Sequence, residues 1–362
     1  MDRTIASAEE VEPAWLTRLL RDRRIIGGDV SVDAVRPGQG AGTFASTVWH
    51  LAVEYRGDPP AQAPRRLFLK VTSGSASPSE FAAKEHRFYT MLAPAMEGGP
   101  GAHLPIPCYD ASFDATTGAA HLLLADISES HEAQSQPDER VGRLAVDALA
   151  ALHAAWWDSP RLGRDIGRLP SLEERRRDVA NARSATATFF DRCGDALPAR
   201  WRRNYERVLD GLPGLYGRHA TGRNLTLAHG DAHLGNYLFP LAGSDAGSPR
   251  AAHMLDWQFW HPTIGGTDLA FLIARWEPEV RRGLESTLLR RYHAALLGHG
   301  VTGYSWDDCF DDYRLSVILV SVFIPVWQCT LWGWAPNLPA VATVMSAYEE
   351  LGCEELLGRS HV

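Results

Sequence analysis

The order of apolar segments in the first fifth of the chain limits the fold more than any other feature. Three strand-like stretches, at 30–35, 46–55 and 67–71, follow one another without a helix between them. The glycine-rich segment 38–43 joins the first two, and the proline-containing polar loop 56–65 precedes the third. Because parallel strands need a long crossover connection, this order predicts an antiparallel meander.

The character of the chain changes after one more apolar strand, at 121–126. A helix over 79–92, with Ser79 at its N-cap, precedes that strand, and mainly helical patterns follow it. We therefore expect an α+β fold with two lobes, 1–125 and 126–362. Further helices are predicted at 9–21, 138–157 and 277–297, and after the capping boxes that begin at Ser171 and Ser305.

Composition excludes several classes of protein. The 362 residues are 45% hydrophobic and 22% charged, which is typical of a globular protein and not of a disordered or fibrous one. The net charge of −8 disfavours general nucleic-acid binding, which needs a basic face. The five cysteines include no C-x-x-C pair, and residues 1–13 lack the apolar core of a signal peptide. We expect a cytoplasmic protein without a disulfide framework.

One apolar run, 315–334, is long enough to raise the question of a membrane span. No charged residue occurs between Arg314 and Glu349. However, Pro325 lies in the middle of the run, Gln328 is polar, and basic flanking clusters are missing. A buried helix is the favoured interpretation, with a membrane anchor as the alternative.

The strongest chemical signal is the sequence His229-Gly230-Asp231-Ala232-His233-Leu234-Gly235-Asn236. The spacing between Asp231 and Asn236 equals that of the Asp-x-x-x-x-Asn element in a kinase catalytic loop. In that element the aspartate accepts a proton from the attacking hydroxyl, and the asparagine holds a magnesium ion. Asp256 follows a short apolar strand and suits a second metal ligand.

The N-terminal segment contains candidates for the nucleotide-binding half. Lys70 is one of only two lysines among the 36 basic residues, and it lies inside an apolar strand. Glu85 follows within the predicted helix, so the two can form the strand-lysine and helix-glutamate pair that positions nucleotide phosphates in kinases. Gly38, Gly40 and Gly42 allow backbone amides to approach phosphates closely.

These motifs together resemble the aminoglycoside phosphotransferase and choline-kinase-like superfamily, in a bacterial branch with ecdysteroid-kinase-like members. The matching segments are 227–236, 255–260, 266–270 and 123–126. The resemblance implies a two-lobed protein-kinase-like fold, with a small antiparallel-sheet N-lobe containing one key helix and a large, mainly helical C-lobe. It implies ATP and Mg²⁺ as cofactors and a hydroxylated small molecule as acceptor.

The resemblance also implies a role for each residue of the site. Asp231 is expected to be the catalytic base, and Asn236 and Asp256 are expected to hold the metal. Asp268 would brace the catalytic segment, and His229 would orient it. His233 would either support the segment or transfer a proton, and structural support is the favoured role. The nucleotide would be bound by Gly38, Gly40, Gly42, Thr43, Lys70 and Glu85, and at the adenine-binding hinge by Leu124, Ala125 and Ile127.

Several departures from protein kinases favour a small-molecule acceptor. The glycine segment reads G-x-G-x-G, His-Gly-Asp replaces His-Arg-Asp, and Asp-Trp-Gln replaces Asp-Phe-Gly. No Ala-Pro-Glu segment follows Asp256, so an activation loop and a protein substrate are disfavoured. Candidate acceptor contacts are Trp260, His261, Asp307, Asp308, Trp327 and Trp332.

Two other classes of function stay open at this point. Gly230-Asp231-Ala232-His233 fits a metal-dependent phosphoesterase motif. His229, Asp231 and His233 could also bind zinc. A catalytically inactive nucleotide-binding module is the third class. The identity of the acceptor and the choice between ATP and GTP stay open. Resistance, biosynthetic and metabolic roles are all compatible with the sequence, as are a monomer and a homodimer.

Overall fold

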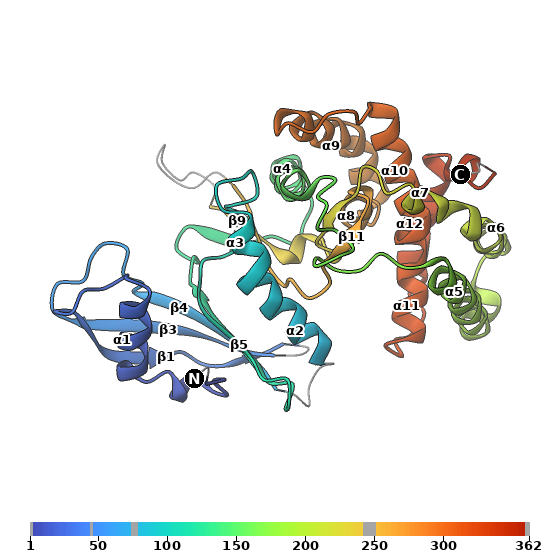
Figure 1. The fold of residues 1–362 in the computed structure, drawn as a ribbon. Helices are drawn as coiled ribbons and strands as arrows, with labels where there is room; N and C mark the ends of the chain where they lie inside the picture. Colours follow the sequence, from blue (N-terminus) through green and yellow to red (C-terminus); the bar gives the residue numbers. More distant parts are fainter. Residues whose placement is uncertain (1–2, 44–45, 74–78, 242–250, 359–362) are drawn as a thin grey trace. The chain divides into compact units, whose positions relative to one another are not determined.

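The computed structural model describes residues 3–43, 46–73, 79–241 and 251–358 (Figure 1). Ser79, at the predicted N-cap, is the first residue of helix α2 (Ser79–Arg87). The chain divides into two compact units. The first unit contains Met1–Ala133 and Leu238–Phe259, and the second contains Gln134–Tyr237 and Trp260–Val362.

An antiparallel sheet forms the body of the first unit. Its strand order is β1-β3-β4-β6-β5, and the short strand β2 also pairs with β3. The predicted meander is therefore confirmed. The strands are β1 (Ser31–Pro37), β2 (Ala41–Gly42), β3 (Thr47–Arg56), β4 (Arg66–Thr72), β5 (Cys108–Phe113) and β6 (Ala120–Ala125).

The core of the first unit is built by alternate residues of these strands together with helix α1 (Pro13–Asp22). On the central strand β4, Leu67 and Leu69 are fully buried in this core, whereas Lys70 faces the other way. Helix α2 contacts β5 and β6. It continues as a wider π-helical turn (Phe88–Leu92) and a short helix α3 (Ala93–Ala95), so the predicted helix 79–92 is α-helical only as far as Arg87.

A second, three-stranded sheet explains why a distant segment belongs to the first unit. Strand β9 (Tyr237–Pro240) lies between β7 (His131–Ala133) and β10 (His253–Met254). The pairing of β7 with β9 extends the first unit to Ala133, beyond the boundary expected after residue 125. In the same segment, the Trp257 ring stacks on Phe88 with centroids 3.7 Å apart.

The second unit is mainly helical (Figure 1). Both predicted capping boxes are present, at Ser171 and Ser305. A two-stranded sheet joins β8 (Thr226–Ala228) and β11 (His261–Thr263). The helices are α4 (Glu139–Trp156), α5 (Leu172–Cys193), α6 (Ala199–Leu215), α7 (Gly217–Ala220), α8 (Gly266–Ile273), α9 (Pro278–Gly298), α10 (Trp306–Leu319), α11 (Ile324–Thr330) and α12 (Leu338–Glu350).

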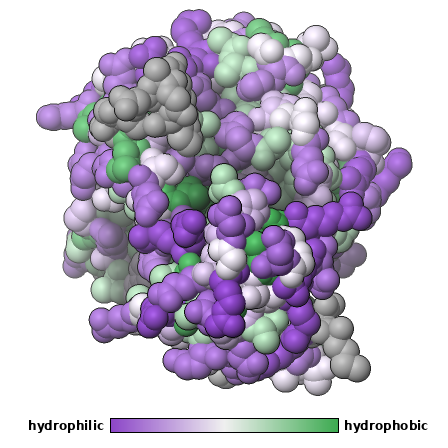
Figure 2. Space-filling view, turned by 90° about the vertical axis from the view of Figure 1, so that its left-hand side faces the viewer, coloured by the Kyte–Doolittle hydropathy of each residue, from purple (hydrophilic) through white to green (hydrophobic). Residues whose placement is uncertain are grey.

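The apolar run 315–334 is divided among several short elements. Helix α10 ends at Leu319, a 3₁₀ turn covers Ser321–Phe323, and α11 begins at Ile324 with Pro325 in its first turn. Proline is tolerated there because the first helical N–H groups have no partner inside the helix. None of the described helices is long and apolar enough to cross a membrane. The face shown in Figure 2 is largely hydrophilic, with small separate hydrophobic areas.

Candidate active site

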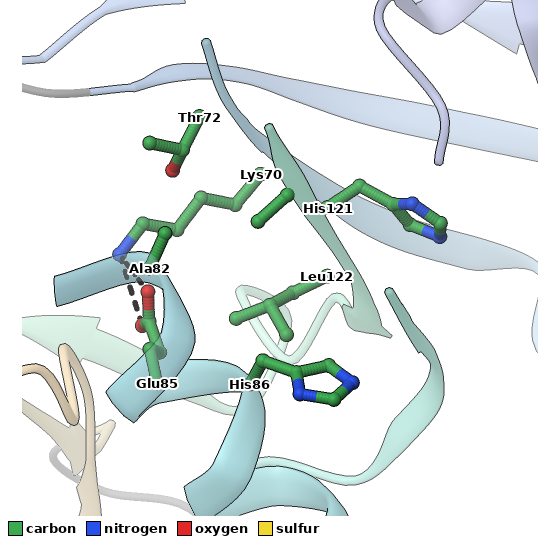
Figure 3. Close-up of a pocket in the computed structure, with 8 residues that line it drawn as sticks. Lys70, Thr72, Ala82, Glu85, His86, His121 and Leu122 are labelled. Carbon is green, nitrogen blue, oxygen red and sulfur yellow. Dashed lines mark hydrogen bonds and ion pairs between the residues drawn. The ribbon is translucent and has the colours of Figure 1, made fainter. Parts of the chain in front are cut away.

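Lys70 lies at the centre of an ion-pair cluster in the first unit. Its side chain extends from β4 toward Glu85 on α2 (Figure 3). The Nζ atom lies 2.9 Å from Glu85 Oε1 and 2.8 Å from Oε2. The Glu85 side chain is buried, and only 13% of the Lys70 side chain is exposed. The strand lysine and helix glutamate therefore form the predicted pair.

Asp256 completes this cluster from the segment after β10. Its Oδ1 atom lies 2.5 Å from Lys70 Nζ and accepts a 2.9 Å hydrogen bond from Gln258 Nε2. Burial alone would lower the pKa of Lys70, but the carboxylates of Glu85 and Asp256 outweigh it and raise that pKa. Lys70 thus stays charged between two carboxylates.

The backbone of Asp256 is in the left-handed region, with φ of 61°. Non-glycine residues rarely adopt this conformation, although aspartate tolerates it better than most. The surrounding contacts fix it, since the next residue, Trp257, is fully buried and donates from Nε1 to Met254 O over 3.1 Å. Strained backbone of this kind is often found at functional sites.

The glycine segment is exposed and runs from the end of β1 through β2. Gly38 N donates to His50 O over 2.8 Å. A Cβ on Gly40 would lie 2.5 Å from Trp49 Nε1, so a larger residue there would force the indole to shift. The backbone N–H and the hydroxyl of Thr43 both donate to Ser46 O.

The predicted adenine-binding hinge lies at the end of β6. Leu124 is buried, and Ala125 N donates to Pro107 O over 2.8 Å. Ile127 O accepts from the backbone N–H groups of Ser130 and His131 and so closes a turn. The roles of these residues in binding adenine stay predictions.

The catalytic-loop motif folds as a compact turn in the second unit, directly after β8. Gly230 has φ of 82°, which lets the chain reverse before Asp231. Asn236 Nδ2 donates to Asp231 O over 2.8 Å and to Asp231 Oδ2 over 3.0 Å. His229 Nδ1 accepts from Asp231 N over 3.3 Å, so this histidine orients the loop from within.

Asp268 on α8 holds the start of this loop. It is fully buried, and its two oxygens accept from His229 N over 2.7 Å and from Gly230 N over 2.9 Å. His153 Nε2 lies 3.1 Å from its Oδ2. Burial would raise the pKa of Asp268, but His153, the charge of His229 and the Gly230 N–H group lower it overall.

Replacing Asp268 with asparagine should destabilise the second unit and slow turnover. An amide supplies one acceptor where the carboxylate supplies two, so one buried N–H group of the loop loses its partner. We expect the free energy of unfolding in urea to fall by about 2–3 kcal/mol. The control is Asp165→Asn, which should cost about 0.5 kcal/mol, since the Asp165 side chain is half exposed and forms a surface ion pair with Arg161. Equal losses in both variants would remove this role from Asp268.

Two oxygen donors fit a magnesium ion chemically. Asn236 uses only Nδ2 in its side-chain hydrogen bonds to described residues, which leaves Oδ1 available as a ligand. Asp256 offers a carboxylate. Carboxylate and amide oxygens suit Mg²⁺, which keeps several waters and is completed by phosphate oxygens. Among the described residues, no group of three or more His, Cys, Asp or Glu side chains is placed to hold a metal.

The predicted acceptor residues are scattered over the second unit. Trp260 is buried, whereas the Trp332 ring is half exposed and lies 5.2 Å from that of Trp334. The Asp308 carboxylate accepts from Ser305 N and caps α10, and Asp307 is exposed beside it. His261 lies in β11 and Trp327 in α11. Their roles in acceptor binding stay predictions.

A cavity of about 650 Å³ lies in the second unit, and none of those six residues lines it. Its wall includes His233, Leu234 and Gly235 of the catalytic loop and Arg275 after α8. We did not predict Arg275 as a site residue. The available signal was its position at the end of the apolar helix that begins with the Asp268 motif, where a lone arginine follows Phe271-Leu272-Ile273-Ala274.

Comparisons with known proteins show which structures have a similar fold. The "putative aminoglycoside phosphotransferase" from Ralstonia eutropha has a similar structure, with 15% identity, 95% of this chain and 98% of that one covered, and a TM-score of 0.54. Choline kinase from Cryptosporidium parvum is 11% identical, with 95% and 96% covered and a TM-score of 0.52. No curated protein matches the sequence.

These structures confirm the predicted two-lobed, kinase-like α+β fold. A sequence model of the phosphotransferase enzyme family matches residues 54–304, which is well over half of the chain and includes Lys70, Asp231 and Asp256. The chain therefore belongs to the phosphotransferase enzyme family and is a small-molecule kinase.

Proposed function

We propose that this kinase transfers the γ-phosphoryl group of Mg-ATP to a hydroxyl of a small molecule. The observation that carries the proposal is the contact of Lys70 with both Glu85 and Asp256. A kinase needs its strand lysine paired with a helix glutamate and its metal-binding aspartate in place. A metal-dependent phosphoesterase does not need the lysine–glutamate pair, and a measurement of ATP turnover separates a kinase from an inactive nucleotide-binding module.

In the first unit, Lys70 is assigned to the α- and β-phosphates of the nucleotide. Its compact ammonium is held by Glu85 at one side and presented to Asp256 at the other. The backbone of Gly38, Gly40 and Gly42, with Thr43, is assigned to the phosphates. The chain at Leu124, Ala125 and Ile127 is assigned to adenine.

Asn236 and Asp256 are assigned to the magnesium ion. A bound Mg²⁺ ion would supply the positive charge that offsets the negative charge developing during transfer. The two Nδ2 hydrogen bonds to Asp231 fix the side-chain amide of Asn236 within the loop, and its Oδ1 atom would be the ligand.

In the second unit, Asp231 is assigned as the base. Its carboxylate accepts the proton of the acceptor hydroxyl while the oxygen of that hydroxyl bonds to the phosphorus, and ADP leaves with the electron pair of the broken bond. Asn236 donates to Asp231 Oδ2, so the other oxygen, Oδ1, is the better placed to take the proton.

Removing the metal or its carboxylate ligand tests this proposal. Turnover of ATP with a phosphorylated acceptor should require Mg²⁺ and should be abolished by Asp256→Ala at every Mg²⁺ concentration, because the phosphates lose their counter-charge. Turnover is measured as ADP formed against added Mg²⁺. Gln258→Ala is the matched control, because it removes a neighbour of Asp256 and leaves the carboxylate in place; it should lower turnover only a few-fold. Persistent Mg²⁺-dependent activity in Asp256→Ala would exclude Asp256 as the ligand.

A further inference from the structure

Arg275 is a partly buried cation that has no anionic partner within ion-pairing distance among the described residues. Its guanidinium carbon lies 4.7 Å from the centre of the Phe271 ring, which is a cation–π contact. Among the described residues, the side chain forms no hydrogen bond and no ion pair. Burial lowers the pKa of Arg275, and the charge of Asp231 opposes that shift. Five N–H donors on this side chain are therefore available to a ligand.

Arg275 belongs to the wall of the 650 Å³ cavity in the second unit. This volume is in the range of small-molecule sites. The wall combines apolar and polar side chains, and Glu277, which is exposed, is the only carboxylate among the described residues that line it. The apolar part of the wall consists of Leu234, Phe271, Leu272, Trp276, Ile324, Pro325, Pro339, Ala340 and Val344.

The same wall reaches the catalytic loop. His233 lines the cavity, and its Nε2 atom lies 3.7 Å from Asp231 Oδ2. The Asp231 charge also acts on Arg275. A molecule in this cavity can therefore contact Arg275 with one group while its hydroxyl is close to the loop that contains the proposed base.

We propose that the cavity binds the phosphoryl acceptor and that the acceptor carries a carboxylate, which Arg275 binds, on a partly apolar body. This inference rests on the proposed function, because it assigns the acceptor of that reaction. The planar guanidinium matches a carboxylate with two parallel hydrogen bonds. A partly buried cation without an anionic partner is costly, and a bound carboxylate reduces that cost. A polycationic acceptor needs several carboxylates, and this wall offers one.

The test is a binding comparison on the full-length protein with Mg²⁺ and a non-hydrolysable ATP analogue. The probes are hydroxylated aromatic compounds that differ in one substituent, which is a carboxylate, a carboxamide or an aminomethyl group. Isothermal titration should show the carboxylates binding at least about tenfold more tightly than their carboxamides. Arg275→Gln should remove that advantage and leave the affinity for the ATP analogue unchanged.

Arg290→Gln is the matched control. Arg290 also packs over an aromatic ring, 4.3 Å from the centre of Trp306, but it does not line the cavity. The Arg290→Gln substitution removes the same charge and the same kind of contact, so the preference for carboxylate compounds should be retained. Urea unfolding of both variants shows that each is folded.

Each other outcome overturns the inference. Equal binding of the three substituents, a preference for the aminomethyl compounds, or no binding of any carboxylate would do so. An Arg275→Gln variant that loses affinity for the ATP analogue would instead place this side chain at the nucleotide. Failure of the proposed function is distinct, because it appears in the wild-type protein as no binding of the ATP analogue and no Mg²⁺-dependent ATP turnover.

Discussion

Asp231→Asn lowers kcat by roughly 10²–10⁴-fold, because the amide cannot accept the proton of the acceptor hydroxyl. The KM for ATP should change little, since Asp231 is assigned to the acceptor side of the reaction. The variant should also stay folded. Asn236 Nδ2 also donates to the backbone O of Asp231, and this hydrogen bond survives the substitution. Steady-state kinetics with varied ATP and a fixed acceptor give both constants.

The control for this prediction is Asp210→Asn. Asp210 is exposed on α6 and pairs with Arg183 at 2.9 Å. Its substitution by asparagine removes an equal charge from the same unit and leaves the catalytic loop unchanged. It should retain wild-type kcat. If Asp231→Asn also kept near-normal turnover while folding normally, Asp231 would not be the base, and its place in the loop would be structural.

Lys70→Ala should reduce kcat/KM for ATP by about 10²–10³-fold, an effect of the size seen when a charge-stabilising donor is removed from an active site. The reason is the loss of the ammonium that contacts both Glu85 and Asp256. The substitution also leaves the buried Glu85 carboxylate without its counter-charge, so stability should fall as well. Kinetics and urea unfolding must therefore be measured on the same samples.

Lys70→Arg separates these two effects. It keeps the positive charge, so the free energy of unfolding should fall by less than in Lys70→Ala. The larger guanidinium fork fits less well between Glu85 and Asp256, so kcat/KM should still drop substantially. Lys84→Ala, which removes the only other lysine, should leave the kinetics unchanged. An unaltered response to ATP in both Lys70 variants would refute the phosphate-positioning role.

Local signals in the sequence were sufficient for much of the fold. The succession of strands without helices predicted the antiparallel sheet, because a parallel arrangement needs crossovers. The capping boxes at Ser171 and Ser305 mark true helix starts, since each satisfies backbone N–H groups at that helix end. The pairing of Lys70 with Glu85 followed from a charged residue in an apolar strand.

Contacts between distant segments were not predictable in the same way. Lys70 and Asp256 are 186 residues apart. The hydrophobic periodicity of the sequence does not indicate that the segment after β9 belongs to the first unit. The wider turn at Phe88–Leu92 and the division of 315–334 depend on tertiary packing. Arg275 was missed because its significance depends on a cavity formed by elements as far apart as His233 and Val344.

The most direct test of the central claim is the fate of the phosphoryl group. Wild-type protein is incubated with ATP, Mg²⁺ and a panel of hydroxylated small molecules that includes the carboxylate compounds, and the products are measured by mass spectrometry. The proposed function predicts a phosphorylated acceptor in equal amount to the ADP formed, with both products formed at least about 10²-fold more slowly by Asp231→Asn. ATP consumption that yields only inorganic phosphate, or no consumption with any acceptor, would contradict it.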